Sequence, residues 1–156
     1  LNKFRREELG FIFQDFNLLD TLTAYENIAL ALTIQKVKAN EIDRRVNEIV
    51  EKLGIKEILK KYPYQVSGGQ KQRIASARAI ITNPKLILAD EPTGNLDNNN
   101  AWEIMKLLEE INSKGTTVIV VTHNLEIVKV MKKRVITVKK GTIVSDSKEG
   151  GYDDEN

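Results

Sequence analysis

Apolar residues recur at helical spacing through the first half of the chain. The clearest case is Asn40–Leu53, where the apolar positions share one face and predict an amphipathic helix: Ile42, Val46, Ile49, Val50 and Leu53. Asn40 is a suitable cap for the start of this helix and Gly54 for its end. A more apolar helix is predicted over Tyr25–Gln35, and a short one over Glu57–Lys61.

The second half of the chain alternates short apolar runs with helical patterns. Leu86–Ala89 and Thr117–Val121 are runs typical of strands, Trp102–Ile111 between them has helical spacing, and Gly10–Phe13 predicts an earlier strand. Such alternation indicates parallel strands that are buried on both faces and joined by right-handed crossovers. We therefore expect an α/β fold. The last predicted elements are a helix over Leu125–Lys132 and a β-hairpin of Val135–Val138 with Ile143–Ser145, turned at Lys140–Gly141.

A hydroxyl and two glycines precede the helical pattern that runs from Ile74 to Ile81. Ser67 is a natural N-cap, and Gly68 and Gly69 allow another molecule to come close to the backbone. The N–H groups and the positive end of the helix dipole favour a phosphate there. Taken alone, the same residues describe a turn with a helix cap. The features that follow favour the phosphate site.

Polar side chains that suit nucleotide hydrolysis follow two of the predicted strands. Asp90 and Glu91 come directly after one strand, and His123, the only histidine, comes shortly after the next. In parallel sheets, ligands bind outside the carboxyl ends of the strands. Asp90 is placed to hold Mg²⁺ through water, and Glu91 to act as general base. A capping pair before Pro92 is the alternative, but adjacent carboxylates after an apolar run are unfavourable unless paired or metal-bound.

Composition limits the classes of function without selecting one. The chain has 156 residues, the size of one domain, and 41% hydrophobic residues, which is ordinary for a soluble core. With 24 basic and 22 acidic residues, it gives no electrostatic reason to expect a nucleic-acid partner. Absence of cysteine excludes disulfides and thiolate metal sites. The longest apolar stretch, Ile28–Leu32, is far short of the ~20 residues that span a bilayer.

In order and spelling, these motifs resemble those of the ATPase subunits of ABC transporters. Val66–Arg73 resembles the family's signature motif, Leu86–Glu91 its Walker B strand with the catalytic glutamate, and Asn95–Asp97 its D-loop. His123 resembles the switch histidine, and Gln14, otherwise an ordinary loop glutamine, the Q-loop residue. The resemblance runs from the Q-loop to the C-terminus. It implies a P-loop NTPase of ABC type: a mostly parallel sheet with helices on both faces and an all-α subdomain.

The resemblance also implies a division of the chain and a set of site residues. Residues 1–23 would hold the end of a core strand and the Q-loop, 24–66 the helical subdomain, 67–147 the remaining core motifs, and 148–156 a flexible tail. ATP and Mg²⁺ are the implied cofactors. Catalysis would use Glu91, His123 and Gln14, and the metal Asp90 and Gln14; the residues implied to bind ATP are Ser67, Gly68, Gly69, Gln70 and Asp97. Asp97 can also cap the helix that follows it.

The resemblance also implies two partners, a second copy of the same protein and an integral membrane subunit. The signature binds the ATP held by a second subunit, so a homodimer with two composite sites is expected. An integral membrane subunit would dock near Asp15–Leu19 and keep the protein at the cytoplasmic face of the plasma membrane, although simple burial of Leu18 and Leu19 also fits. Asp90–Asp97 has the spelling of one branch of the family, which serves cell division, lipoprotein release, and macrolide or antimicrobial-peptide export. Within it, Phe13–Leu19 favours the cell-division ATPases.

One departure from the family pattern is large, because no G-x-x-x-x-G-K-S/T phosphate loop occurs in the chain. We expect the chain, which begins at Leu1, to be the C-terminal part of a longer protein whose earlier part supplies that loop. Otherwise the chain would be a non-catalytic partner that only donates its signature. A DNA-acting ABC ATPase is a further alternative, but it predicts a coiled-coil or zinc insertion between Gln14 and Ser67, and that segment has neither cysteines nor sustained heptads.

Overall fold

The computed structural model describes residues 8–148, so most of the predicted flexible tail, 148–156, lies outside the described residues. Two compact units divide at Val121/Thr122 and are each described by itself. The first contains a parallel sheet in the order β1 (Leu9–Phe13), β2 (Leu86–Asp90), β3 (Thr117–Val121). This sheet and the helices that surround it confirm the predicted α/β class.

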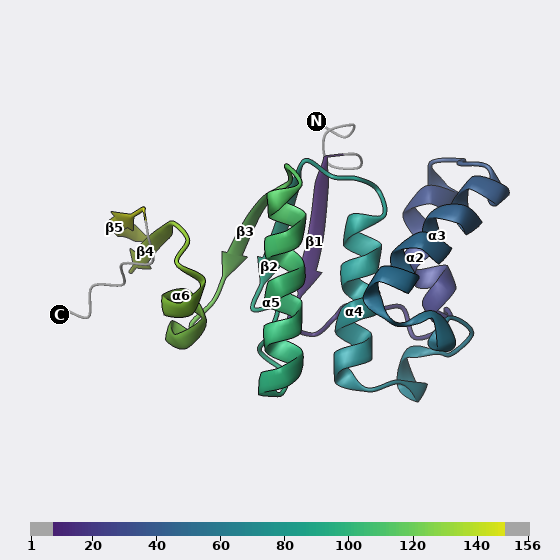
Figure 1. Cartoon of the computed structure of the whole chain (residues 1–156), viewed down its shortest axis with the longest axis horizontal. Coiled ribbons are helices and arrows are strands. Elements are labelled where there is room, and N and C mark those ends of the chain that lie inside the picture. Colours follow the sequence, from purple (N-terminus) through teal and green to yellow (C-terminus); the bar gives the residue numbers. More distant parts are fainter. Residues whose placement is uncertain (1–7, 149–156) are drawn as a thin grey trace. The chain divides into compact units, whose positions relative to one another are not determined.

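Four α-helices accompany the sheet in the described part of the first unit: α2 (Ala24–Ile34), α3 (Ala39–Leu53), α4 (Gly68–Ile80) and α5 (Asn98–Ser113). Helix α4 lies between β1 and the pair α2–α3, and α5 packs along the sheet (Figure 1). Since α4 contacts both α2 and β1, it joins the helical part of the unit to the sheet. The signature motif therefore begins a helix that both parts share.

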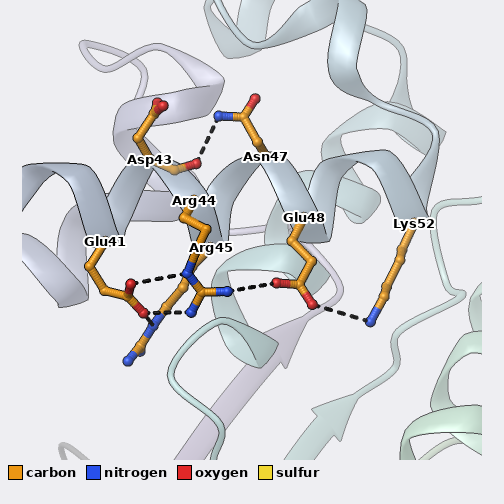
Figure 2. Close-up of polar contacts among 7 residues, drawn as sticks. All are labelled: Glu41, Asp43, Arg44, Arg45, Asn47, Glu48 and Lys52. Carbon is orange, nitrogen blue, oxygen red and sulfur yellow. Dashed lines mark hydrogen bonds and ion pairs between the residues drawn. The ribbon is translucent and has the colours of Figure 1, made fainter.

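The helical part has its own apolar core. Side chains from α2, α3 and α4 are fully buried in it, among them Ile28, Leu32, Val46, Val50 and Ile74. Burial of each such side chain contributes about 1.5–3 kcal/mol. The opposite face of α3 is charged, with Glu41, Arg44, Glu48 and Lys52 linked in a chain of ion pairs (Figure 2). This division confirms the amphipathic helix predicted from the sequence.

Two local predictions were wrong. Helix α3 begins at Ala39 with Lys38 as N-cap, whereas the Asn40 side chain accepts only from the neighbouring Glu41 N–H, at 3.0 Å. The predicted helix over Glu57–Lys61 is a 3₁₀ turn, Lys56–Ile58, and a second 3₁₀ turn spans Pro63–Gln65. Proline begins that second turn because its fixed φ and missing N–H suit the first position of a helix.

The second unit contains α6 (Leu125–Met131) and an antiparallel hairpin of β4 (Val135–Lys139) and β5 (Thr142–Ser147). The hairpin turns at Lys140 and Gly141, whose φ angles are 50° and 75°. Two consecutive positive φ values match the twist of a two-residue hairpin turn. The predicted hairpin and its turn are thus confirmed. Within residues 8–148, none of the helices combines the length and apolar character that crossing a bilayer requires.

Candidate nucleotide site

The carboxyl ends of the three parallel strands lie level with one another. Phe13 pairs with Asp90, and Asp90 with Val121, at the last position of each strand. Gln14 and Glu91, the next residues along their strands, therefore leave the sheet at the same edge. This register brings the predicted Q-loop glutamine and the predicted Walker B carboxylates to one place, as expected for a ligand site in a parallel sheet.

Glu91 has a left-handed backbone, with a φ of 47°. Its N–H donates to the Val121 carbonyl at 2.8 Å, and its own carbonyl accepts from the Gly94 N–H at 3.1 Å. A non-glycine residue in this region is strained and persists only where its surroundings impose it, which is common at active sites. The strain turns the chain sharply after β2, and Glu91 is half-buried while the preceding Asp90 is exposed.

The loop that contains Gln14 is joined to the turn after Glu91. The Asn95 side-chain amide donates to the Gln14 carbonyl at 3.0 Å, and Gln14 Nε2 lies 3.5 Å from Asn95 Oδ1. A Cβ added to Gly94 would lie 2.7 Å from Gln14 Nε2, so the Gln14 side chain packs directly on the Gly94 backbone. Glycine at position 94 thus allows the Q-loop and the D-loop turn to touch.

The start of α4 forms the predicted cap. Ser67 Oγ accepts from the Gln70 N–H at 3.2 Å, and Gln70 Oε1 accepts from the Ser67 N–H at 3.0 Å. This reciprocal capping box satisfies the first and last of the four N–H groups from Ser67 to Gln70. It leaves the N–H groups of Gly68 and Gly69 without a partner in the described part of the chain. The helix is therefore capped, and its own residues use neither N–H group; of the two glycines, Gly68 is exposed and Gly69 is buried.

The two glycines of the signature differ in their surroundings. A Cβ on Gly69 would lie 2.5 Å from Asn100 Oδ1, so a larger residue there would have to displace the Asn100 side chain, which Asp97 holds. A Cβ on Gly68 would meet nothing closer than 3.8 Å, the carbonyl oxygen of Asn95. The chain's own packing therefore explains Gly69 but not Gly68, which is exposed.

Asp97 acts as the N-cap of α5. Its Oδ1 accepts from the Asn100 N–H at 2.8 Å, and the Asn100 side-chain amide donates to both carboxylate oxygens at 3.1 Å. The hydrogen bond from the Asn100 backbone is the main reason that the pKa of Asp97 is lowered. The predicted capping role is confirmed, and a role of Asp97 toward nucleotide stays a prediction.

Sequence reasoning missed a buried link between α4 and the turn after β2. Gln72, fully buried in α4, donates its side-chain amide to the Pro92 carbonyl. A usable signal was present, because Gln72 shares the helix face of Ala75 and Ala79, where a polar side chain needs a partner. The signature helix is thereby fixed to the residues that follow Glu91.

The remaining predicted residues are placed as follows. His123 lies exposed in the second unit, between β3 and α6, where the Thr122 hydroxyl accepts from the Asn124 N–H at 3.0 Å. Its predicted position beside Glu91 stays a prediction. Among residues 8–148, no three or more His, Cys, Asp or Glu side chains converge to hold a metal ion. Asp90 and Gln14 would therefore supply only part of the ligands of a Mg²⁺ ion, the rest coming from phosphates and water.

The profile of the ABC transporter family matches residues 2–94. The chain therefore belongs to the ABC transporter family. It is 49% identical over 149 residues to the cell division ATP-binding protein FtsE of Bacillus subtilis (strain 168), across 96% of this chain and 65% of that protein. It is 52% identical over 148 residues to the uncharacterized ABC transporter ATP-binding protein YvcR of the same organism, across 94% of this chain and 57% of that protein.

Solved structures show the same fold. The ATP-binding cassette MJ0796, a dimer in a post-hydrolysis state with ADP and Pi, matches with a TM-score of 0.83 and 39% identity, across 94% of this chain and 65% of that chain. The fold is thus that of the ABC-type P-loop NTPases. The chain spans about 65% of the length of FtsE from Bacillus subtilis.

Proposed function

We propose that the complete protein binds and hydrolyses ATP as a homodimer and drives an integral membrane partner. The start of α4 carries this proposal. Gly68 and Gly69 have N–H groups without a partner within residues 8–148, and the open space at Gly68 is not used by the chain's own packing. Free N–H groups beside an open glycine at a helix N-terminus favour close approach of a phosphate.

Each site residue has a role in this proposal. The residues Ser67, Gly68, Gly69 and Gln70 hold the γ-phosphate of the ATP bound to the second subunit, with Asp97 at the same interface. Bound Mg²⁺ supplies charge neutralisation on the phosphates, and Asp90 and Gln14 are the residues that would hold it. Glu91 accepts the proton of the attacking water at a carboxylate oxygen. His123 contacts the γ-phosphate.

For the particular system, we propose an FtsE-like ATPase with an FtsX-like membrane subunit. In that role it acts at the cytoplasmic face of the plasma membrane and controls cell-wall hydrolases during bacterial division. Similarity to FtsE of Bacillus subtilis and to FtsE of Streptococcus pneumoniae (strain ATCC BAA-255 / R6), each 49% identical, supports this choice. The second candidate is the ATPase of a lipoprotein-release, macrolide or antimicrobial-peptide exporter, and the comparable similarity to YvcR, an uncharacterized ABC transporter ATP-binding protein at 52% identity, supports a transporter role only in general. No nucleic-acid partner is expected.

The test uses the full-length protein and its Glu91→Gln variant. The amide keeps the shape of the side chain but cannot accept a proton, so ATP binding should persist while turnover is nearly abolished. A stable ATP-bound dimer should then accumulate, seen by size exclusion with Mg-ATP. Wild-type turnover in Glu91→Gln would exclude Glu91 as the base. Lack of any ATP binding by the wild-type protein would leave only the role of a non-catalytic partner that donates its signature.

The membrane partner is tested separately. Co-purification with the membrane protein encoded beside this chain's gene, from detergent-solubilised membranes, should be lost when Leu19, which is 47% exposed, is changed to Glu. Leu18 packs against the helical core, so Leu18→Glu should instead unfold the protein. A cell-division permease in the complex supports the FtsE-like role, whereas an exporter permease supports the second candidate.

A further inference from the structure

Arg78, in the last turn of α4, reaches across to the loop that contains Gln14. Its Nη1 donates to the Asn17 carbonyl at 2.6 Å and its Nη2 to the Phe16 carbonyl at 2.9 Å. The planar guanidinium suits this arrangement, because it holds two donors in a fixed fork. Burial lowers the pKa of Arg78, although an arginine stays charged at neutral pH. A partly desolvated charge makes each of these hydrogen bonds stronger than a neutral one.

The two carbonyls belong to a strained turn. Phe16 and Asn17 both have left-handed backbones, with φ angles of 66° and 53°. Two consecutive non-glycine residues in this region are unfavourable unless outside contacts hold them. Two backbone hydrogen bonds lie within the turn, from the Phe16 N–H to the Phe13 carbonyl at 3.1 Å and from the Asn17 N–H to the Asp15 carbonyl at 2.7 Å. An open hollow of about 210 Å³, lined in part by Asn17 and Arg78, lies beside it. The two hydrogen bonds from Arg78 are therefore well placed to fix the turn.

Two groups of the proposed site, the Phe16 ring and Gln14, lie in or next to this turn. Phe16 Cζ lies 4.0 Å from where a Cβ on Gly68 would stand, so its ring borders the open start of α4. Gln14, two residues earlier, is held by Asn95 through its carbonyl. Gly68 and Arg78 are ten residues apart, or about 15 Å along a helix. The Q-loop turn is thus hydrogen-bonded to the last turn of α4, and its Phe16 ring lies beside the first turn.

We propose that Arg78 is a positioning residue, which holds the left-handed turn at Phe16–Asn17 and thereby sets the positions of Gln14 and of the Phe16 ring beside the signature. This inference rests on the proposed function, since it assigns Arg78 an effect on the ATP site. The competing explanation is that Arg78 only stabilises the packing of α4 on the rest of the unit.

The experiment compares Arg78→Met and Arg78→Lys with the wild type in the full-length protein. Methionine keeps much of the aliphatic bulk and removes the donors, whereas lysine keeps a charge and a donor but not the fork. Arg44→Met, on the exposed face of α3, is the matched control. Hydrogen exchange is measured for the amides of Asp15–Leu19 and of α3, and ATP turnover is measured as kcat and KM.

Arg78→Met should raise exchange at Phe16 and Asn17 about tenfold or more, as expected for loss of charge-assisted hydrogen bonds, with α3 unchanged. Arg78→Lys should be intermediate, and Arg44→Met should match the wild type at Phe16 and Asn17. Turnover should show a lower kcat in Arg78→Met with an unchanged KM for ATP. Unchanged exchange at Phe16 and Asn17, or an equal rise throughout α3, would overturn the proposal. The exchange result decides the role of Arg78 even where the wild type fails to hydrolyse ATP, which would refute only the proposed function.

Discussion

Gln72 in the signature helix donates its side-chain amide to the carbonyl of Pro92, twenty residues further along the chain and one residue after Glu91. Gln72 is fully buried, and its Oε1 has no hydrogen-bond partner within the described residues. The Gln72 side chain therefore contributes to the fold through its N–H donor and not through its oxygen. The contact therefore ties the position of α4 to the turn that carries the proposed general base.

The donor role of Gln72 predicts an order of stability among its variants. Gln72→Glu has the same shape but replaces the donor with an oxygen that faces the Pro92 carbonyl, so it should lower the free energy of unfolding by roughly 3 kcal/mol. Gln72→Met removes the donor and the unpaired Oε1 together and should lower it by only about 1 kcal/mol. Urea unfolding of the full-length protein measures both. Equal stability of the two variants would contradict the donor role.

The two signature glycines should respond in opposite ways to alanine. Gly69→Ala should lower the free energy of unfolding by about 1–3 kcal/mol, because its Cβ would lie 2.5 Å from Asn100 Oδ1. Gly68→Ala has room and should raise stability by up to about 1 kcal/mol, since alanine is the better helix former. Thermal melts without nucleotide check these signs.

Gly68→Ala should be at least as stable as the parent protein without nucleotide, but should perform worse in ATP-driven dimerisation. In the Glu91→Gln background, Gly68→Ala should weaken the ATP-driven dimer seen by size exclusion, and Gly68→Asp should abolish it, because a carboxylate would face the γ-phosphate. Monomer binding of ATP should stay near normal in both. A normal ATP-driven dimer in Gly68→Asp would mean that the signature residues only cap α4 and do not bind the phosphate.

The left-handed backbone of Glu91 predicts that its glycine and alanine variants differ in stability. Glu91→Gly and Glu91→Ala both remove the carboxylate and should both abolish turnover. They differ in backbone strain, since glycine adopts a φ of 47° without strain and alanine adopts it only at a cost. Glu91→Gly should therefore exceed Glu91→Ala in free energy of unfolding by about 1 kcal/mol. Chemical denaturation of the inactive pair measures the difference, and the opposite order would mean that the position is not strained.

The charged face of α3 predicts a small contribution to stability that is lost at acid pH. Hydrogen bonds from Arg44 and then Arg45 lower the pKa of Glu41 from 4.5 to about 2 (Figure 2). A carboxylate whose pKa is lower in the folded state stabilises the fold above the unfolded value, and this contribution is lost as the pH falls through the folded value. The extra stability of the wild type over Glu41→Gln should thus be constant above about pH 5, fall as the pH decreases from there, and be lost only below about pH 2. Glu51→Gln, on the same helix, is the control.

Local features of the fold were well determined by the sequence. The amphipathic pattern of Asn40–Leu53, the cap at Ser67, the cap at Asp97 and the hairpin turn at Lys140–Gly141 depend on residues a few positions apart, and all are present. The parallel strands followed from their apolar runs, and with them the common edge of Gln14 and Glu91. Where two nearby residues could begin a helix, the prediction from sequence was wrong: Asn40 was expected to cap α3, and Lys38 is at the N-cap position.

Only the tertiary structure decided which distant groups meet. Arg78 and Phe16 are 62 positions apart, and Asn95 and Gln14 are 81, so no spacing rule links them. The sequence likewise presents Gly68 and Gly69 as equals, and they differ because the packing of α4 against α5 fills the space beside one and leaves the other open. Sequence patterns report what each segment favours by itself, whereas these contacts depend on where packed helices and strands bring side chains and carbonyls together.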